Sequence, residues 1–268
     1  MEDNKDQTET TAGDSLPVSP EPDITLGDAM AGVFSEPGDT FASVKKSQKK
    51  NYWLLPLLIV IIISILSSFL VLRDEELSAE IKDKQKAAMQ ERIDKAVKEG
   101  KMSKEDADKQ LEQSQKFMSG GMMMVFGVIG SFFAVVIFFF LKGLIYWGSV
   151  KIFKGTAGFK DVLNVLGLAG LITSIQLIID TVLAVLTGKL LTNIGPVLLF
   201  TEESVGKSMY KLIANFDLIN IWYLVIVGIG LAKVSDLNSN KTIPLVFGLW
   251  IIWILLSSFG PLSFLMGG

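Results

Sequence analysis

Cysteine and histidine, the two side chains most used for nucleophilic, acid–base and zinc chemistry, are both absent from this sequence. Without a thiolate or an imidazole, the chain has no disulfide, no cysteine nucleophile, no ordinary zinc site and no histidine acid–base catalyst. No pair of carboxylates at a catalytic spacing takes over that chemistry. We therefore expect a protein that is not an enzyme, with no catalytic residue, no cofactor and no metal site.

Ionisable residues inside long apolar segments are the next candidates, because a charge in a membrane is costly and therefore often functional. Lys142 and Asp180 are two such residues, and Gln176 stands one helical turn before Asp180. Lys142 precedes Tyr146 by four residues, so we expect its ammonium to reach the inner interface. Asp180 follows a full apolar span and should cap the outer end of its helix. The alternative is a polar path lined by Gln176, Asp180 and Asn220.

Four further candidate residues lie at the start of helical segments or in motifs. Asp217 begins the apolar segment 216–234, where a carboxylate can accept hydrogen bonds from the free N–H groups of a helix N-terminus. Trp222 lies one turn further along the same segment. Pro37 and Phe41 fall in a short motif that precedes the first apolar run.

The charges of this chain are segregated along the sequence. Of the 53 charged residues, 15 lie in the first fifty positions and 22 between 74 and 118, while half of all residues are apolar. Uncharged runs of about 18 residues or more indicate helices that cross a bilayer. The sequence predicts an all-α polytopic membrane protein with five transmembrane helices, over 54–72, 122–147, 161–187, 216–234 and 243–265. A net charge of −3 without a basic patch argues against a nucleic-acid partner.

Lysines next to the first span predict the orientation. Lys45, Lys46, Lys49 and Lys50 precede it, and positive charge favours the cytoplasmic side. The N-terminus should therefore lie inside, and five spans then place the C-terminus outside. No cleaved signal peptide is expected before Leu54. We expect a multi-pass protein of the bacterial cytoplasmic membrane, or of the ER or Golgi membrane if the source is eukaryotic.

Four segments should lie outside the bilayer. Residues 1–28 are acidic and poor in apolar residues, which predicts a disordered tail. Residues 29–53 form a juxtamembrane amphipathic region, either two short helices against the inner membrane surface or a loosely ordered linker. Residues 74–118 predict an extramembrane helical hairpin turning at Gly100, serving as a partner-binding or oligomerising element or as a solvated spacer. Residues 188–215 predict an interfacial loop with one short amphipathic helix.

Three stretches, in this order on a five-span frame, carry a resemblance to a known family. They are GVFSEPGDTF at 32–41, YWG at 146–148 with KG at 154–155 and GFK at 158–160, and FDLINIW at 216–222 with GIGLAKV at 228–234. The chain resembles the Yip (Ypt-interacting protein) domain family, prokaryotic branch, over about residues 26–265. Compared with that family, residues 74–118 are an insertion that we expect not all members to share.

The resemblance implies a polytopic protein with a cytosolic N-terminus, and eukaryotic relatives bind prenylated Rab-type GTPases. This chain has no Asp-Leu-Tyr-Gly-Pro segment, and LGLAG at 166–170 stands where Gly-Tyr-Gly would be expected, so Rab binding is not carried over. We expect a non-enzymatic membrane scaffold, assembly or partner-binding factor that uses region 32–41. The alternative is a small-solute or ion transporter or channel near Gln176 and Asp180. Expected partners are the lipid bilayer and an unidentified membrane or cytoplasmic protein, with a second copy of the chain as a further candidate.

Overall fold

The computed structural model describes residues 23–47, 50–118, 121–190 and 195–259, so most of the predicted tail over 1–28 lies outside the described residues. Within these ranges the chain is helical and contains no strand. The helices are, in order, α1 (Leu26–Ser35), α2 (Pro37–Lys46), α3 (Leu54–Arg73), α4 (Glu75–Lys98), α5 (Lys104–Met118), α6 (Met122–Ile152), α7 (Phe159–Thr187), the 3₁₀ turn η1 (Pro196–Leu199), α8 (Glu202–Val205), α9 (Lys207–Ala214), α10 (Leu218–Ser235) and α11 (Ser239–Phe259).

Five of these helices, α3, α6, α7, α10 and α11, are long and apolar enough to cross a membrane. Many of their large apolar side chains point away from the protein, for example Ile62, Phe133 and Ile252, each more than half exposed. In water such a surface would be a liability, whereas acyl chains cover it at no cost. The predicted class, an all-α protein with five apolar spans, is confirmed.

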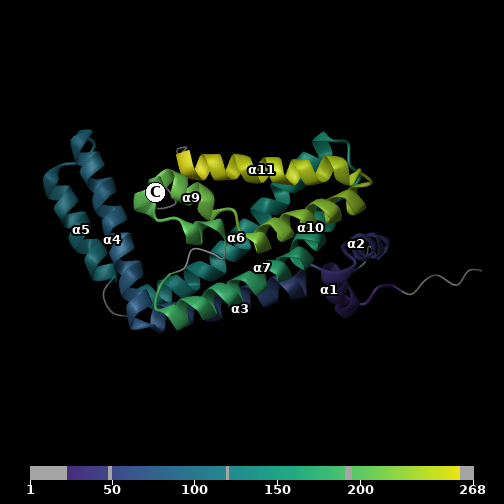
Figure 1. The fold of residues 1–268 in the computed structure, drawn as a ribbon, viewed down its shortest axis with the longest axis horizontal. Coiled ribbons are helices and arrows are strands. Elements are labelled where there is room, and N and C mark those ends of the chain that lie inside the picture. The colour runs from purple at the N-terminus through teal and green to yellow at the C-terminus, as the bar shows by residue number, and fades with distance from the viewer. Residues whose placement is uncertain (1–22, 48–49, 119–120, 191–194, 260–268) are drawn as a thin grey trace, which may run out of the picture.

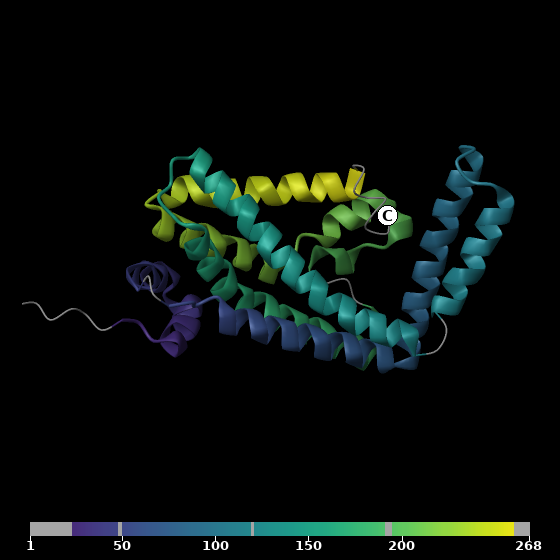
Figure 2. The same ribbon diagram turned by 180° about the vertical axis from the view of Figure 1, so that it is seen from behind.

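Helix α7 is the centre of the bundle and packs between α3 and α10 (Figures 1 and 2). Nearly its whole first half is buried, and glycines let the neighbouring backbones approach it. A Cβ at Gly167 would lie 2.5 Å from the Cα of Trp53, which leads into α3. The Trp53 N–H also donates a 3.2 Å hydrogen bond to the buried Asn164 side chain. Close backbone approach thus fixes the entry of α3 against α7.

Two spans have an end that differs from the predicted range by more than two residues. Helix α6 continues to Ile152, beyond the expected end at 147, and α11 begins at Ser239, ahead of 243. Polar residues at these ends lower the local hydropathy without interrupting the helix. Thr242, for example, is buried, and its hydroxyl donates a 2.7 Å hydrogen bond to the carbonyl of Gly228 in α10. Residues 260–265 of the predicted fifth span lie outside the described residues.

The predicted hairpin between the first two spans is present as α4 and α5. They run side by side and project from the end of the bundle opposite to α1 and α2, as both views show (Figures 1 and 2). The turn begins at Gly100, whose φ of +68° favours glycine, and the N–H of Lys101 donates to the carbonyl of Ala96. Ser103 caps the start of α5, because its Oγ accepts the N–H of Asp106 at 3.1 Å.

The hairpin is tied to the bundle by Glu80, whose carboxylate accepts the N–H of Leu190 at 2.9 Å and pairs with Lys84 at 2.7 Å. Burial alone would raise the pKa of Glu80, but these contacts outweigh it and hold the pKa below its ordinary value. The base of the hairpin is therefore anchored next to the end of α7.

The segment after α7 does not form the single short helix that we predicted. Gly206, with a φ of +80°, separates α8 from α9, so Glu202 and Lys207 belong to two different helices. The second of them, α9, packs against α11 and lies beside its far end in both views (Figures 1 and 2). The segment between α7 and α10 therefore packs against the bundle through α9 before α10 begins.

Candidate functional site

The first candidate region is the pair α1–α2, which packs against α7 and α10. Its apolar residues, spaced three and four apart, are buried against these helices: Ala29, Val33, Phe41 and Val44. Phe41 is fully buried next to Gly230 of α10, where a Cβ would lie 2.9 Å from the Phe41 ring. The pair is thus an integral part of the protein, and the linker alternative is wrong.

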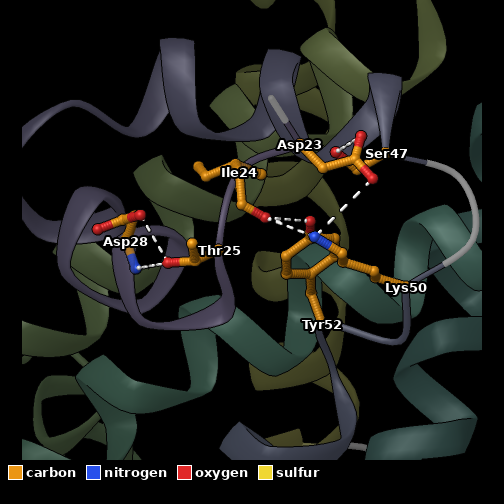
Figure 3. Close-up of polar contacts among 7 residues, drawn as sticks. All are labelled: Asp23, Ile24, Thr25, Asp28, Ser47, Lys50 and Tyr52. Carbon is orange, nitrogen blue, oxygen red and sulfur yellow. Dashed lines mark hydrogen bonds and ion pairs between the residues drawn. The ribbon is translucent and has the colours of Figure 1, made fainter. Parts of the chain in front are cut away.

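A polar cluster ties the segment before α1 to the segment after α2 (Figure 3). The Tyr52 hydroxyl donates a 2.7 Å hydrogen bond to the carbonyl of Ile24, and the Lys50 ammonium donates to the same oxygen at 3.3 Å. The Ser47 hydroxyl donates to Asp23 at 3.1 Å. Since Tyr52 is only 1% exposed, these contacts fix the start of α1 against the entry of the first span.

Asp236 links α2 to the ends of α6 and α10. Its carboxylate pairs with the Lys45 ammonium at 2.6 Å and accepts the Thr156 hydroxyl at 2.7 Å. Its φ of +56° is left-handed, a conformation that Asp and Asn tolerate better than most residues. The hydrogen bonds from Lys45 and Thr156 lower the pKa of Asp236 below its ordinary value. No local pattern in the sequence predicts this role of Asp236, because Lys45 and Thr156 lie far from it along the chain.

Acidification should therefore weaken the attachment of α2. Since the pKa of Asp236 is depressed by folding, its contribution is complete above the unfolded pKa of about 3.9 and is lost as the pH falls through the folded value. For so exposed a pair we expect about 0.2–1 kcal/mol. Thermal unfolding in detergent at pH 7 and pH 3 should show a larger drop for the wild type than for Asp236→Asn, which keeps the left-handed backbone. Equal drops would contradict this role.

Pro37 and Trp222 take structural positions at the edge of α1–α2. Pro37 is the first residue of α2, where a missing N–H is tolerated. The ring centre of Trp222, on α10, lies 5.8 Å from that of Phe34 at the end of α1. Both residues are 37% exposed. Within the motif 32–41, Phe41 is therefore unavailable to a partner, whereas Phe34, Glu36 and Asp39 are exposed.

The second candidate region is a cavity of about 460 Å³ between α6, α7, α10 and α11. Its lining includes Lys142 of α6, Gln176 of α7, Asn220 of α10 and Asp217 just before α10. Asp217 occupies the N-cap of α10, where its Oδ1 accepts the N–H groups of Ile219 at 2.7 Å and Asn220 at 3.0 Å. The structure therefore gathers three of the candidate residues around one space.

Two of the expected roles need correction. The Lys142 side chain is exposed, and its ammonium lies 5.5 Å from the centre of the Tyr223 ring, where it lines the cavity. It is therefore directed along α10 to the cavity and not to the interface. Asp180 does not cap a helix end, because α7 continues to Thr187 and ends at Gly188, whose φ is +64°. Apolar residues after Asp180 carry the helix on. Asp180 is also not among the residues that line the cavity, unlike Gln176 and Asn220.

Comparison with known proteins places the chain in a family. The model of the Yip1 domain matches residues 31–260. The chain is also similar to membrane protein YknW of Bacillus subtilis (strain 168), with 24% identity over 140 residues that cover 49% of this chain and 58% of YknW. No solved structure matches. The expected resemblance is thus confirmed, and because the family match covers most of the sequence, the chain belongs to the Yip1 domain family of membrane proteins.

Proposed function

We propose that this protein is a non-enzymatic membrane scaffold or assembly factor, and that α1–α2 is the platform on which a protein partner binds. The observation that carries the proposal is the fixed attachment of α1–α2. Its apolar residues are used inside the protein, and Tyr52, Lys45 and Asp236 hold it in one place. A surface that is already ordered loses little conformational entropy on binding, which favours recognition.

The platform presents charge and one aromatic ring to its surroundings. Glu36 and Asp39 are exposed at the junction of α1 and α2, close in sequence to the partly exposed Phe34. We place this face in the cytoplasm on the strength of the lysines before the first span. A membrane or cytoplasmic protein with a basic surface is the partner that fits these side chains.

Crosslinking in native membranes, followed by affinity purification, tests the proposal. Glu36→Lys combined with Asp39→Lys should lower the recovery of the crosslinked partner about tenfold, because like charges then face each other. Asp108→Lys, an exposed change on the hairpin at the other end, is the matched control and should recover the partner normally. Equal recovery from all three proteins would contradict the platform.

A transporter is the alternative, favoured by the polar side chains that line the cavity. We expect no ion or proton leak from vesicles that contain the wild type, Asp180→Asn or Asp217→Asn. Asp217→Asn keeps a capping side chain but loses the charge at the helix N-terminus, so it should cost about 0.3–1 kcal/mol of stability. Wild-type flux that either variant abolishes, with the fold retained, would replace the scaffold by a transporter.

A further inference from the structure

Three polar side chains that line the cavity, Lys142, Gln176 and Asn220, form no hydrogen bond or ion pair with the described residues. Lys142 forms no ion pair with any residue in the described part of the chain, and its ammonium meets only the face of Tyr223, 5.5 Å from the ring centre. The side-chain amides of Gln176 and Asn220 likewise have no hydrogen bond to a described residue. Polar groups in an apolar surrounding are normally paired, so an occupant of the cavity should supply these partners.

Asp217 points to the same conclusion more strongly. The residue is only 2% exposed, and while its Oδ1 caps α10, its Oδ2 is buried without a hydrogen-bond partner in the part of the chain that the structure describes. An unsatisfied buried carboxylate oxygen costs more than the net gain of an ordinary hydrogen bond. A donor, and best a cationic one, is therefore missing next to Asp217.

Lys142 and Asp217 border one cavity but do not form an ion pair with each other, since no nitrogen–oxygen distance between them is 4.0 Å or less. Two opposite charges kept apart across a shared space match a ligand that itself carries both charges. An anionic group would pair with Lys142, and a cationic group would donate to Asp217 Oδ2. A ligand with one charge would leave the other side chain unpaired.

Much of the exposed part of the cavity lining is apolar. It includes Phe138, Leu141 and Ile145 of α6 and Ile252 and Leu256 of α11, which are between 41% and 54% exposed. The C-terminal end of α6 lies near the start of α11. From there the two helices move apart, and α9 lies between their other ends, as both views show (Figures 1 and 2). In a membrane this opening meets acyl chains, so the occupant would enter from the lipid phase.

We propose that the cavity binds the head group of a zwitterionic phospholipid. The phosphate pairs with the Lys142 ammonium, the amine donates to Asp217 Oδ2, and the acyl chains leave between α6 and α11. The volume of about 460 Å³ falls within the range of about 300–1,000 Å³ that is usual for small-ligand sites. The side-chain amides of Gln176 and Asn220 supply further N–H donors for the phosphate oxygens.

Native mass spectrometry of the full chain in detergent tests this site. The protein is titrated with phosphatidylethanolamine, with anionic phosphatidylglycerol and with uncharged diacylglycerol of the same chain length, and separately with free phosphoethanolamine. The wild type should retain one phosphatidylethanolamine about tenfold more tightly than the other lipids, because only that lipid pairs with both charges. Lys142→Met and Asp217→Asn should each lose that preference.

Asp161→Asn is the matched control, since it removes a carboxylate from the first turn of α7, outside the cavity lining, and it should bind as the wild type does. Thermal unfolding of each variant shows that the fold is retained. Equal binding of all three lipids would overturn the proposal and leave a cavity filled by water or acyl chains. Binding of phosphatidylglycerol that only Lys142→Met abolishes would also overturn it, as would free phosphoethanolamine binding as tightly as the lipid.

Discussion

Gly167→Ala should destabilise the bundle by about 1–3 kcal/mol, even though alanine favours a helix. The added Cβ would lie 2.5 Å from the Cα and 2.9 Å from the carbonyl oxygen of Trp53, and backbone atoms cannot move aside as the end of a flexible side chain can. Either α3 shifts away from α7 or the hydrogen bond from Trp53 N–H to Asn164 is lost. Thermal unfolding in detergent, followed by tryptophan fluorescence, measures the effect.

Gly170 is the control on the same helix. A Cβ there would meet only the Val60 side chain, at 3.4 Å, next to a second cavity of about 370 Å³ that leaves room for adjustment. Gly170→Ala should therefore be neutral or stabilise by up to about 1 kcal/mol through helix propensity. If both substitutions behaved alike, the close contact between α3 and α7 would not exist as described.

Phe41→Ala should release α1–α2 from the bundle while leaving the five spans assembled. Removal of a fully buried phenylalanine costs about 3–5 kcal/mol, and this ring fills the space that Gly230 leaves open. The remaining ties, such as Lys45 with Asp236, are exposed and contribute much less. Limited proteolysis of the purified protein should show new cleavage within residues 26–46, and hydrogen exchange there should accelerate.

Phe34→Ala tests whether the effect belongs to the buried ring. Phe34 is 37% exposed and meets mainly the Trp222 ring, so its loss should cost about 1 kcal/mol and leave the cleavage pattern unchanged. Protection of residues 26–46 in Phe41→Ala equal to that in the wild type would show that α1–α2 is held by something other than this contact.

The spans and the short helices could be predicted from the sequence because each depends on the residues of its own segment. Segregated charges indicate the spans, and the four- and three-residue spacing of Leu26, Met30 and Val33 indicates the first short helix. What those helices pack against depends on Gly230, far along the chain, and no local pattern identifies that contact. The same holds for Gly167 and Trp53, whose approach becomes visible only in three dimensions.

The cavity shows a different limit. Lys142 and Asp217 are each recognisable from the sequence as polar residues in or beside a span, but no local pattern predicts that they border one space. In the structure α9 packs against α11, α10 starts directly after Asp217, and both side chains line the same cavity. The predicted capping role of Asp180 is wrong for a different reason. Its charge suggested the end of a helix, but the apolar residues after it extend α7 to Thr187.

The central claim is that α1–α2 binds its partner while docked on the bundle, and the absence of native cysteine allows a direct test. Lys45→Cys combined with Asp236→Cys places two thiols at the positions of an ion pair, and a short bifunctional thiol reagent should join them in native membranes. We predict that the bridge forms and that the bridged protein still captures the partner that the wild type captures. No bridge, or a bridged protein that loses the partner, would contradict a docked platform.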